Sequence, residues 1–160
     1  MLISKNKSTL IGLILLIAYF LQFTLKLEWN WLYQLQHEQM YKRWSGLGLA
    51  IFIAFQWLLT LTRTAKKFRK HAMSMQNIHK WLGALSPLFF YMHSMGLGYG
   101  YLLLLSYIFF SNTLLGYFNL DVIKNSSDTL FKGWMIVHVA LSLLVTILMV
   151  FHIIMVFYYK

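Results

Sequence analysis

The sequence predicts an all-α integral membrane protein, a helical bundle of about five transmembrane helices. Two observations predict this class: 59% of the 160 residues are apolar while only 11% are charged, and the charged residues lie in short segments between long apolar runs. Soluble domains usually carry about 25% charged residues, because enough polar surface must face water. We therefore exclude an ordinary soluble domain and expect residues 1–160 to form a single transmembrane domain.

The limits of the helices follow from stretches that contain no Asp, Glu, Lys or Arg. A bilayer core of about 30 Å needs about 20 apolar helical residues, and such stretches cover 9–25, 44–62, 81–120 and 133–159. The third has 40 residues, about twice the length that one crossing needs, and glycines at 96, 98 and 100 offer a place for a turn within it. We therefore predict five spans, over about 9–27, 44–62, 79–96, 100–119 and 132–158.

The segment 28–43 lies between the first two predicted spans and is rich in aromatic residues. Trp29, Trp31, Tyr33 and Tyr41 alternate there with Gln and His, a composition typical of the lipid headgroup layer. We expect this segment to form a helix that lies flat in the membrane interface.

Orientation follows from the Lys and Arg residues, because cytoplasmic loops hold an excess of them. With the N-terminus inside, ten lie on the inner side and four on the outer side; the inner ones are Lys5, Lys7, Arg63, Lys66, Lys67, Arg69, Lys70, Lys80, Lys124 and Lys132, and the outer ones are Lys26, Lys42, Arg43 and Lys160. We expect a bacterial-type inner (plasma) membrane, with the N-terminus cytoplasmic and the C-terminus outside.

The net charge of +10 would indicate a nucleic-acid partner in a soluble protein. Here the basic residues flank apolar spans, so we expect membrane lipid as a partner and no nucleic acid. One cluster has two interpretations, a topology and anionic-lipid signal or a docking surface for a soluble electron donor. It comprises Arg63, Lys66, Lys67, Arg69 and Lys70.

The histidines carry the chemical signal, since the chain has no Cys and any metal must be held by His, Met or oxygen. Four of the six form two pairs with a spacing of 14 residues, His79 with His93 and His138 with His152. On a helix, this step brings both members to one face, about 21 Å apart along the axis. Each helix therefore offers one imidazole toward each side of the membrane.

Two such helices packed together could hold one flat group between His79 and His138 on the inner side. A second group would lie between His93 and His152 on the outer side. A haem with two axial imidazoles and an apolar surround fits this geometry. Zinc or copper fits poorly, because three or four ligands would have to converge at one depth.

Small residues after these histidines would leave room for a haem plane. They are Gly83, Ala84, Ser94, Gly96, Ala140 and Ser142.

A simpler interpretation remains open, in which each membrane histidine packs between helices and bonds to a nearby Ser or carbonyl. His37 and His71 lie in predicted loops, where we expect them to be solvated or interfacial.

The two sequences HKWLGALSPLFFYMH (79–93) and HVALSLLVTILMVFH (138–152) resemble the ferric reductase-like transmembrane domain family. That family includes NADPH oxidases, ferric reductases and the haem subunit of the bacterial methionine sulfoxide reductase system. The resemblance covers about 79–158 and implies two b-type haems ligated by the paired histidines. The cytochrome b of quinol-oxidising complexes has a similar spacing.

The expected function is that of a membrane-embedded dihaem cytochrome b, the transmembrane electron-transfer component of an oxidoreductase. A flavin or nicotinamide domain has no room in the chain, so a separate donor, a flavin reductase or a quinol, and an outer-face acceptor are expected. No side chain is assigned a catalytic role, since the four carboxylates fall in predicted loops. The alternative is a haem-free membrane anchor or assembly subunit of a larger complex. A proton-relay transporter is disfavoured because the spans lack Asp, Glu, Lys and Arg, apart from lysines at their edges such as Lys26 and Lys80.

Overall fold

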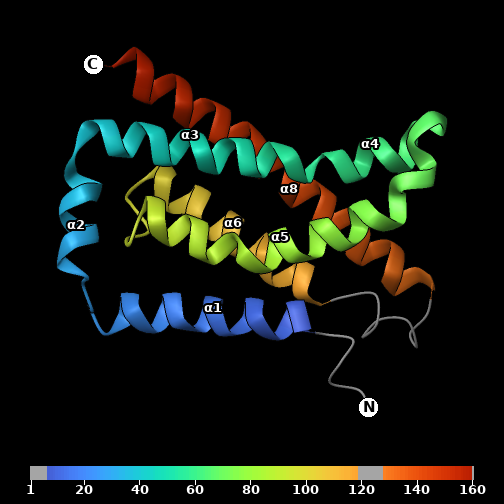
Figure 1. Ribbon diagram of the computed structural model, residues 1–160, viewed down its shortest axis with the longest axis horizontal. Coiled ribbons are helices and arrows are strands. Elements are labelled where there is room, and N and C mark those ends of the chain that lie inside the picture. Colours follow the sequence, from blue (N-terminus) through green and yellow to red (C-terminus); the bar gives the residue numbers. More distant parts are fainter. Residues whose placement is uncertain (1–6, 119–127, 160) are drawn as a thin grey trace. The chain divides into compact units, whose positions relative to one another are not determined.

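The structure, a computed structural model, describes residues 7–118 and 128–159. All regular structure within these residues is helical, which confirms the predicted all-α class (Figure 1). In chain order the elements are α1 (Lys7–Thr24), α2 (Asn30–His37), α3 (Gln39–Gln56), α4 (Leu58–Thr64), the 3-10 helix η1 (Lys66–His71), α5 (Ala72–His93), α6 (Tyr101–Tyr117) and α8 (Asp128–Tyr158).

Among the residues that the structure describes, three helical segments are long and apolar enough to cross a membrane: Lys7–Thr24, Gln39–Thr64 and Asp128–Tyr158. The helix α6 is apolar but shorter, with 17 residues, and α5 is not among the three. Large apolar side chains of α8 are widely exposed, and Val145 is its one buried residue in the part of the helix that the structure describes. An apolar surface of this kind suits contact with lipid rather than with water.

The helix limits differ from the predicted spans at several points. The helix α5 begins at Ala72, seven residues before the predicted start at 79, because its first residues, AMSMQNI, mix apolar and polar side chains and form no continuous apolar run. The predicted span 44–62 begins earlier, at Gln39, and has a break at Trp57 between α3 and α4. Lys5, Lys124, Lys160 and residue 119, which belong to the predicted topology and spans, lie outside the described residues.

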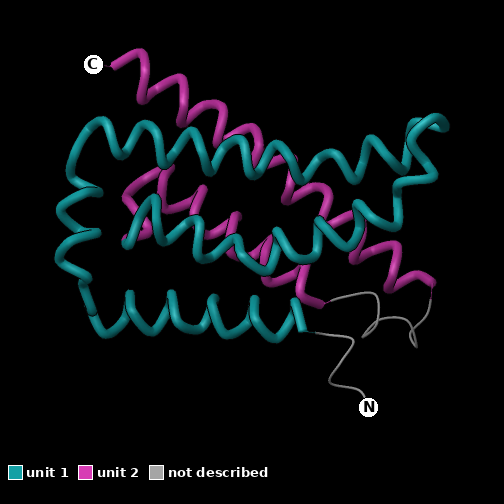
Figure 2. Tube along the Cα trace, viewed as in Figure 1, with its two compact units in different colours: residues 1–95 teal, residues 96–160 magenta. Residues whose placement is uncertain are grey.

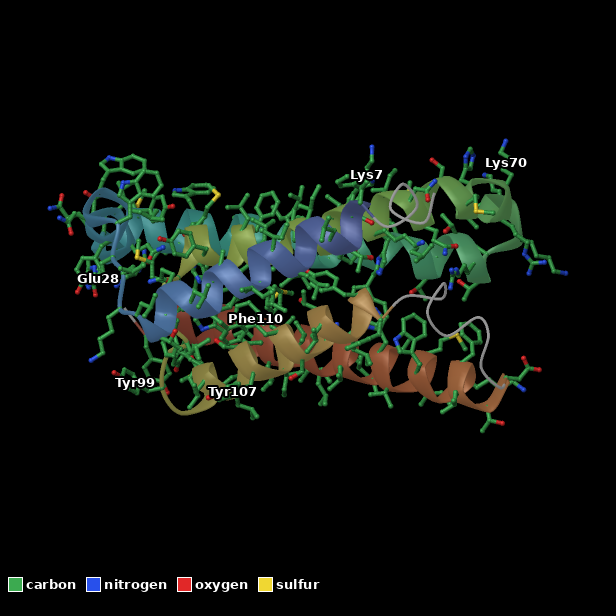
Figure 3. The ribbon with its side chains drawn as sticks, turned by 90° about the horizontal axis from the view of Figure 1, so that it is seen from below. Lys7, Glu28, Lys70, Tyr99, Tyr107 and Phe110 are labelled. Atoms are coloured by element: carbon green, nitrogen blue, oxygen red, sulfur yellow. The ribbon has the colours of Figure 1, made fainter. Side chains whose placement is uncertain are left out.

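The chain forms two compact units, residues 1–95 and 96–160 (Figure 2). In the first unit α5 lies between α1 on one side and α3 with α4 on the other (Figure 1). The helix α2 joins α1 to α3 at one end, near Glu28, while Lys7 and Lys70 lie toward the opposite end (Figure 3). The predicted topology likewise assigns Lys7 and Lys70 to the same side of the membrane.

Aromatic contacts hold α1 against α5 in the first unit. The ring of Tyr19, which is 3% exposed, meets the rings of Phe90 and Tyr91 edge to face at centroid distances of 5.5 Å and 6.3 Å. Such pairs contribute about 0.5–1.5 kcal/mol beyond the area that they bury. They fix the register of α1 beside the half of α5 that ends at His93.

Pro87 lies inside α5 and removes one backbone donor from the helix. The carbonyl of Gly83 would normally accept from residue 87, and it accepts instead from the hydroxyl of Ser86 at 2.8 Å. The hydroxyl thus satisfies the carbonyl that proline leaves without its helical donor, so the helix continues from Ala72 to His93.

The C-terminal end of α5 is held by a buried glutamine of α2. Gln36, 8% exposed, donates to the carbonyls of Tyr91 and Met92 at 2.7 Å and 3.2 Å and accepts from the backbone N–H of Met95 at 3.0 Å. The last carbonyls of a helix have no partner within it. One side chain therefore satisfies the end of α5 and ties it to α2.

Replacing Gln36 by Leu is expected to destabilise the protein. The change keeps the size of the side chain and leaves the Met95 N–H and the Tyr91 carbonyl without their partner, at a cost of about 1–3 kcal/mol for each group. Thermal unfolding in detergent, followed by circular dichroism, measures the loss. Gln34→Leu, an exposed position on the same helix, is the control, and equal unfolding temperatures for the two variants would contradict the expectation.

In the second unit α6 and α8 pack against each other as an antiparallel pair (Figure 1). The connection before α6 contains Gly98 and Gly100, with φ of 75° and 58°. A Cβ at Gly98 would lie 2.6 Å from the Cβ of Leu102, so this backbone position requires glycine. The glycine-rich segment is a break between helices, as the sequence predicts, and the Ser106 hydroxyl secures it by donating to the Leu97 carbonyl at 2.9 Å.

Candidate functional site

Each predicted histidine pair lies on one continuous helix. His79 and His93 lie on α5 in the first unit, and His138 and His152 lie on α8 in the second. All four side chains are half-buried. The helical rise of 1.5 Å per residue separates the members of each pair by about 21 Å along the axis. The pairing of His79 with His138, and of His93 with His152, joins the two units and stays a prediction.

His93 is enclosed by residues of α3. The hydroxyl oxygen of Ser45 lies 3.1 Å from its Nδ1, and Gly46 lies directly against the ring. A Cβ added at Gly46 would come within 2.9 Å of the Cε1 of His93, closer than real Cβ contacts. A larger residue at 46 would therefore force the imidazole of His93 to shift, because the ring occupies the space of that side chain.

His138 is enclosed in a similar way by α6 and by its own helix. The ring of Trp134, one turn earlier on α8, stacks on the imidazole of His138, with ring centroids 5.6 Å apart and an angle of 1° between the ring planes. A Cβ at Gly116 of α6 would lie 3.3 Å from its Cε1. The indole N–H of Trp134 donates to the Leu115 carbonyl at 2.9 Å. The rings and the glycine together restrict the orientation of the imidazole.

His152 meets the other end of α6. The hydroxyl of Tyr101 lies 3.3 Å from its Nδ1. Between the two histidines the amide of Asn112 donates to the Ser142 hydroxyl at 3.0 Å, and Ser142 donates to the His138 carbonyl at 2.8 Å. One helix, α6, thus contacts both ends of the histidine face of α8.

His79 has room beside it on its own helix. Gly83 follows one turn later on the same face, and a Cβ there would meet no atom within 4 Å. The surface of α5 is therefore open beside Gly83, one turn from His79. Two of the small residues predicted to leave room are used otherwise: Ala84 is packed in the core, 1% exposed, and Ser142 bonds Asn112.

The other two histidines are exposed, at the ends of α2 and η1. His37 lies with its Nδ1 2.7 Å from the Tyr33 carbonyl, and His71 ends η1. The basic cluster at 63–70 lies on α4 and η1, where the Arg63 guanidinium donates to Gln76 at 3.2 Å. Neither His37 nor His71 lies in a predicted span.

The residues around the histidines offer some of the features that a haem site needs. Within residues 7–118 and 128–159, no group of three or more His, Asp and Glu side chains gathers as a metal-ion site would require. Haem needs two imidazoles, an apolar surround and space against the helix. Half-buried imidazoles, ring partners at Nδ1 for His93 and His152, and the open backbone at Gly83 supply features of this kind.

Sequence reasoning did not identify the residues that surround the histidines: Ser45, Gly46, Tyr101, Gly116 and Trp134. The spacing along the sequence could have indicated two of these residues. Tyr101 and Gly116 are 15 residues apart on α6, close to the 14 residues between His138 and His152, as antiparallel helices require.

Comparisons with protein-family models, with curated proteins and with solved structures find no match to this chain.

Proposed function

We propose that the chain is a membrane-embedded dihaem cytochrome b of the ferric reductase-like kind. The observation that carries this proposal is the repeated pair of histidines, 14 residues apart, on each of two continuous apolar helices. The side chains around the rings support it, since haem-ligating histidines need fixed ring orientations. The proposal includes five spans, formed by α1, α3 with α4, α5, α6 and α8.

In this proposal His79 and His138 hold the inner haem, while His93 and His152 hold the outer one. The chain supplies neutral imidazole ligands, an apolar surround and separation of the two levels by about 21 Å along the helices. When bound, the haems supply one-electron transfer. The protein's own residues bind and orient, and none is assigned to acid–base chemistry.

The partners follow from this assignment. We propose a cytoplasmic flavin reductase or a quinol as the electron donor, and an acceptor at the outer face of a bacterial-type inner membrane. The N-terminus would be cytoplasmic and the C-terminus outside, because most Lys and Arg residues then lie on the cytoplasmic side.

A second function is that of a haem-free anchor or assembly subunit. The contacts of His93 with Ser45 and of His152 with Tyr101 favour it, because they are also the contacts of histidines that pack between helices. The two functions differ in whether the purified protein carries a chromophore.

The test is a dithionite-reduced minus oxidised visible spectrum of the purified protein, with haem quantified as the pyridine haemochrome. We expect a b-type spectrum and two haems per chain after expression with ample haem supply. Protein that is folded by circular dichroism and carries no haem under these conditions would overturn the proposal and leave the anchor function.

A further inference from the structure

A polar cluster lies where α2 and α3 meet the end of α5. Its members are Gln36, Tyr41 and Ser45, and they bond to consecutive groups around His93. The Tyr41 hydroxyl donates to the Met92 carbonyl at 2.8 Å, which also accepts from Gln36. The backbone before His93 is therefore held from α2 and α3, and the ring of His93 is held from α3.

The contacts of the Ser45 hydroxyl favour one tautomer of His93. The single hydroxyl hydrogen of Ser45 is donated to the Tyr41 carbonyl at 2.7 Å, and the other carbonyl within reach, that of Lys42 at 3.3 Å, also only accepts. With the hydrogen on the Tyr41 carbonyl, which is the shortest of these contacts, the Ser45 oxygen accepts from His93 at 3.1 Å. The donor is then the Nδ1–H of the imidazole.

A neutral imidazole carries one ring N–H. With the hydrogen on Nδ1, the lone pair of His93 lies on Nε2, the nitrogen at the far end of the ring. Gly46 adds a steric limit on the same ring, since a Cβ at this position would lie 2.9 Å from Cε1. The hydrogen bond with Ser45 and the close approach of Gly46 therefore act on the ring of His93 from two neighbouring residues of α3.

We propose that Ser45 is a positioning residue for His93, which fixes the Nδ1–H tautomer and presents Nε2 as the nitrogen that ligates haem iron. The inference rests on the proposed function. A hydrogen bond to the other ring nitrogen of a ligating histidine fixes the orientation of the ring and raises its basicity. Loss of such a bond typically weakens binding of the metal about 10- to 100-fold. A more basic ligand stabilises the ferric state, so the reduction potential of that haem is lowered by Ser45.

The experiment compares Ser45→Ala, Ser45→Thr and Thr24→Ala with the unmodified full chain. Thr24 is a matched control, because its hydroxyl bonds the carbonyls of residues 20 and 21 at 2.9 Å and 3.1 Å without touching a histidine. We expect Ser45→Ala to raise the reduction potential of one haem, to alter its low-spin electron paramagnetic resonance signal and to weaken its binding about 10- to 100-fold. Ser45→Thr keeps the hydroxyl and restores these properties, and Thr24→Ala leaves both haems unchanged.

Two haems with unchanged potentials, resonance signals and affinities in Ser45→Ala would overturn this inference and leave the proposed function intact. Unmodified protein without haem would overturn both. A measurement independent of haem is the nitrogen-15 resonance of histidine-labelled, haem-depleted protein, with the His93 signals assigned by their loss in His93→Ala. Protonated Nδ1 supports the inference, and protonated Nε2 overturns it even where Ser45→Ala fails to fold.

Discussion

Replacing His93 by Ala is expected to remove one of the two proposed haems and to leave the other in place. His152→Ala should give the same result, and the double variant should lose no more haem than either single one, because both ligands serve one iron. Combining His79→Ala with His93→Ala should remove both haems, since these residues belong to different levels. Haem per chain by pyridine haemochrome, with a redox titration to identify the remaining haem, measures each outcome.

The controls are His37→Ala and His71→Ala, whose side chains are exposed at the ends of α2 and η1. Both should keep both haems. The proposed pairing is wrong if His93→Ala and His152→Ala remove different haems, so that their double variant loses both. The ligand assignment as a whole is wrong if all four single variants keep full haem content.

Replacing Gly46 by Ala is expected to displace the ring of His93. The added Cβ would lie 2.9 Å from Cε1, and a shift of the ring would disturb its contact with Ser45. Overpacking of a well-packed position typically costs about 1–3 kcal/mol. We expect a lower unfolding temperature in detergent and weaker binding of one haem.

Gly48→Ala provides the comparison, two residues later on the same helix. A Cβ there meets no atom within 4 Å, and alanine is favoured over glycine inside a helix by roughly 0.5–1 kcal/mol. We therefore expect this variant to be at least as stable as the unmodified protein. Equal stability and equal haem content in the two alanine variants would show that the contact between Gly46 and His93 does not constrain the ring.

The helical class could be predicted because apolar composition and the absence of charged residues act over whole spans. The helix ends were less predictable. Lys26 follows α1 with φ of 51°, a left-handed conformation that usually falls to glycine at a helix end. The N–H groups of Leu27 and Lys26 donate to the carbonyls of Gln22 and Phe23 at 3.0 Å and 3.4 Å and end the helix. No residue type in the sequence predicts these bonds.

The sequence by itself determined that the chain is helical and apolar, and that the paired histidines lie on common helix faces, because helical periodicity is a local property of the backbone. The same periodicity supports the prediction of two ligand levels. Only the tertiary structure decided what surrounds each ring, such as Ser45 and Gly46 at His93 and Gly116 at His138. Residues as far apart as 45 and 93 come into contact through helix packing, and packing depends on the shapes of both surfaces, which the spacing along one helix does not encode.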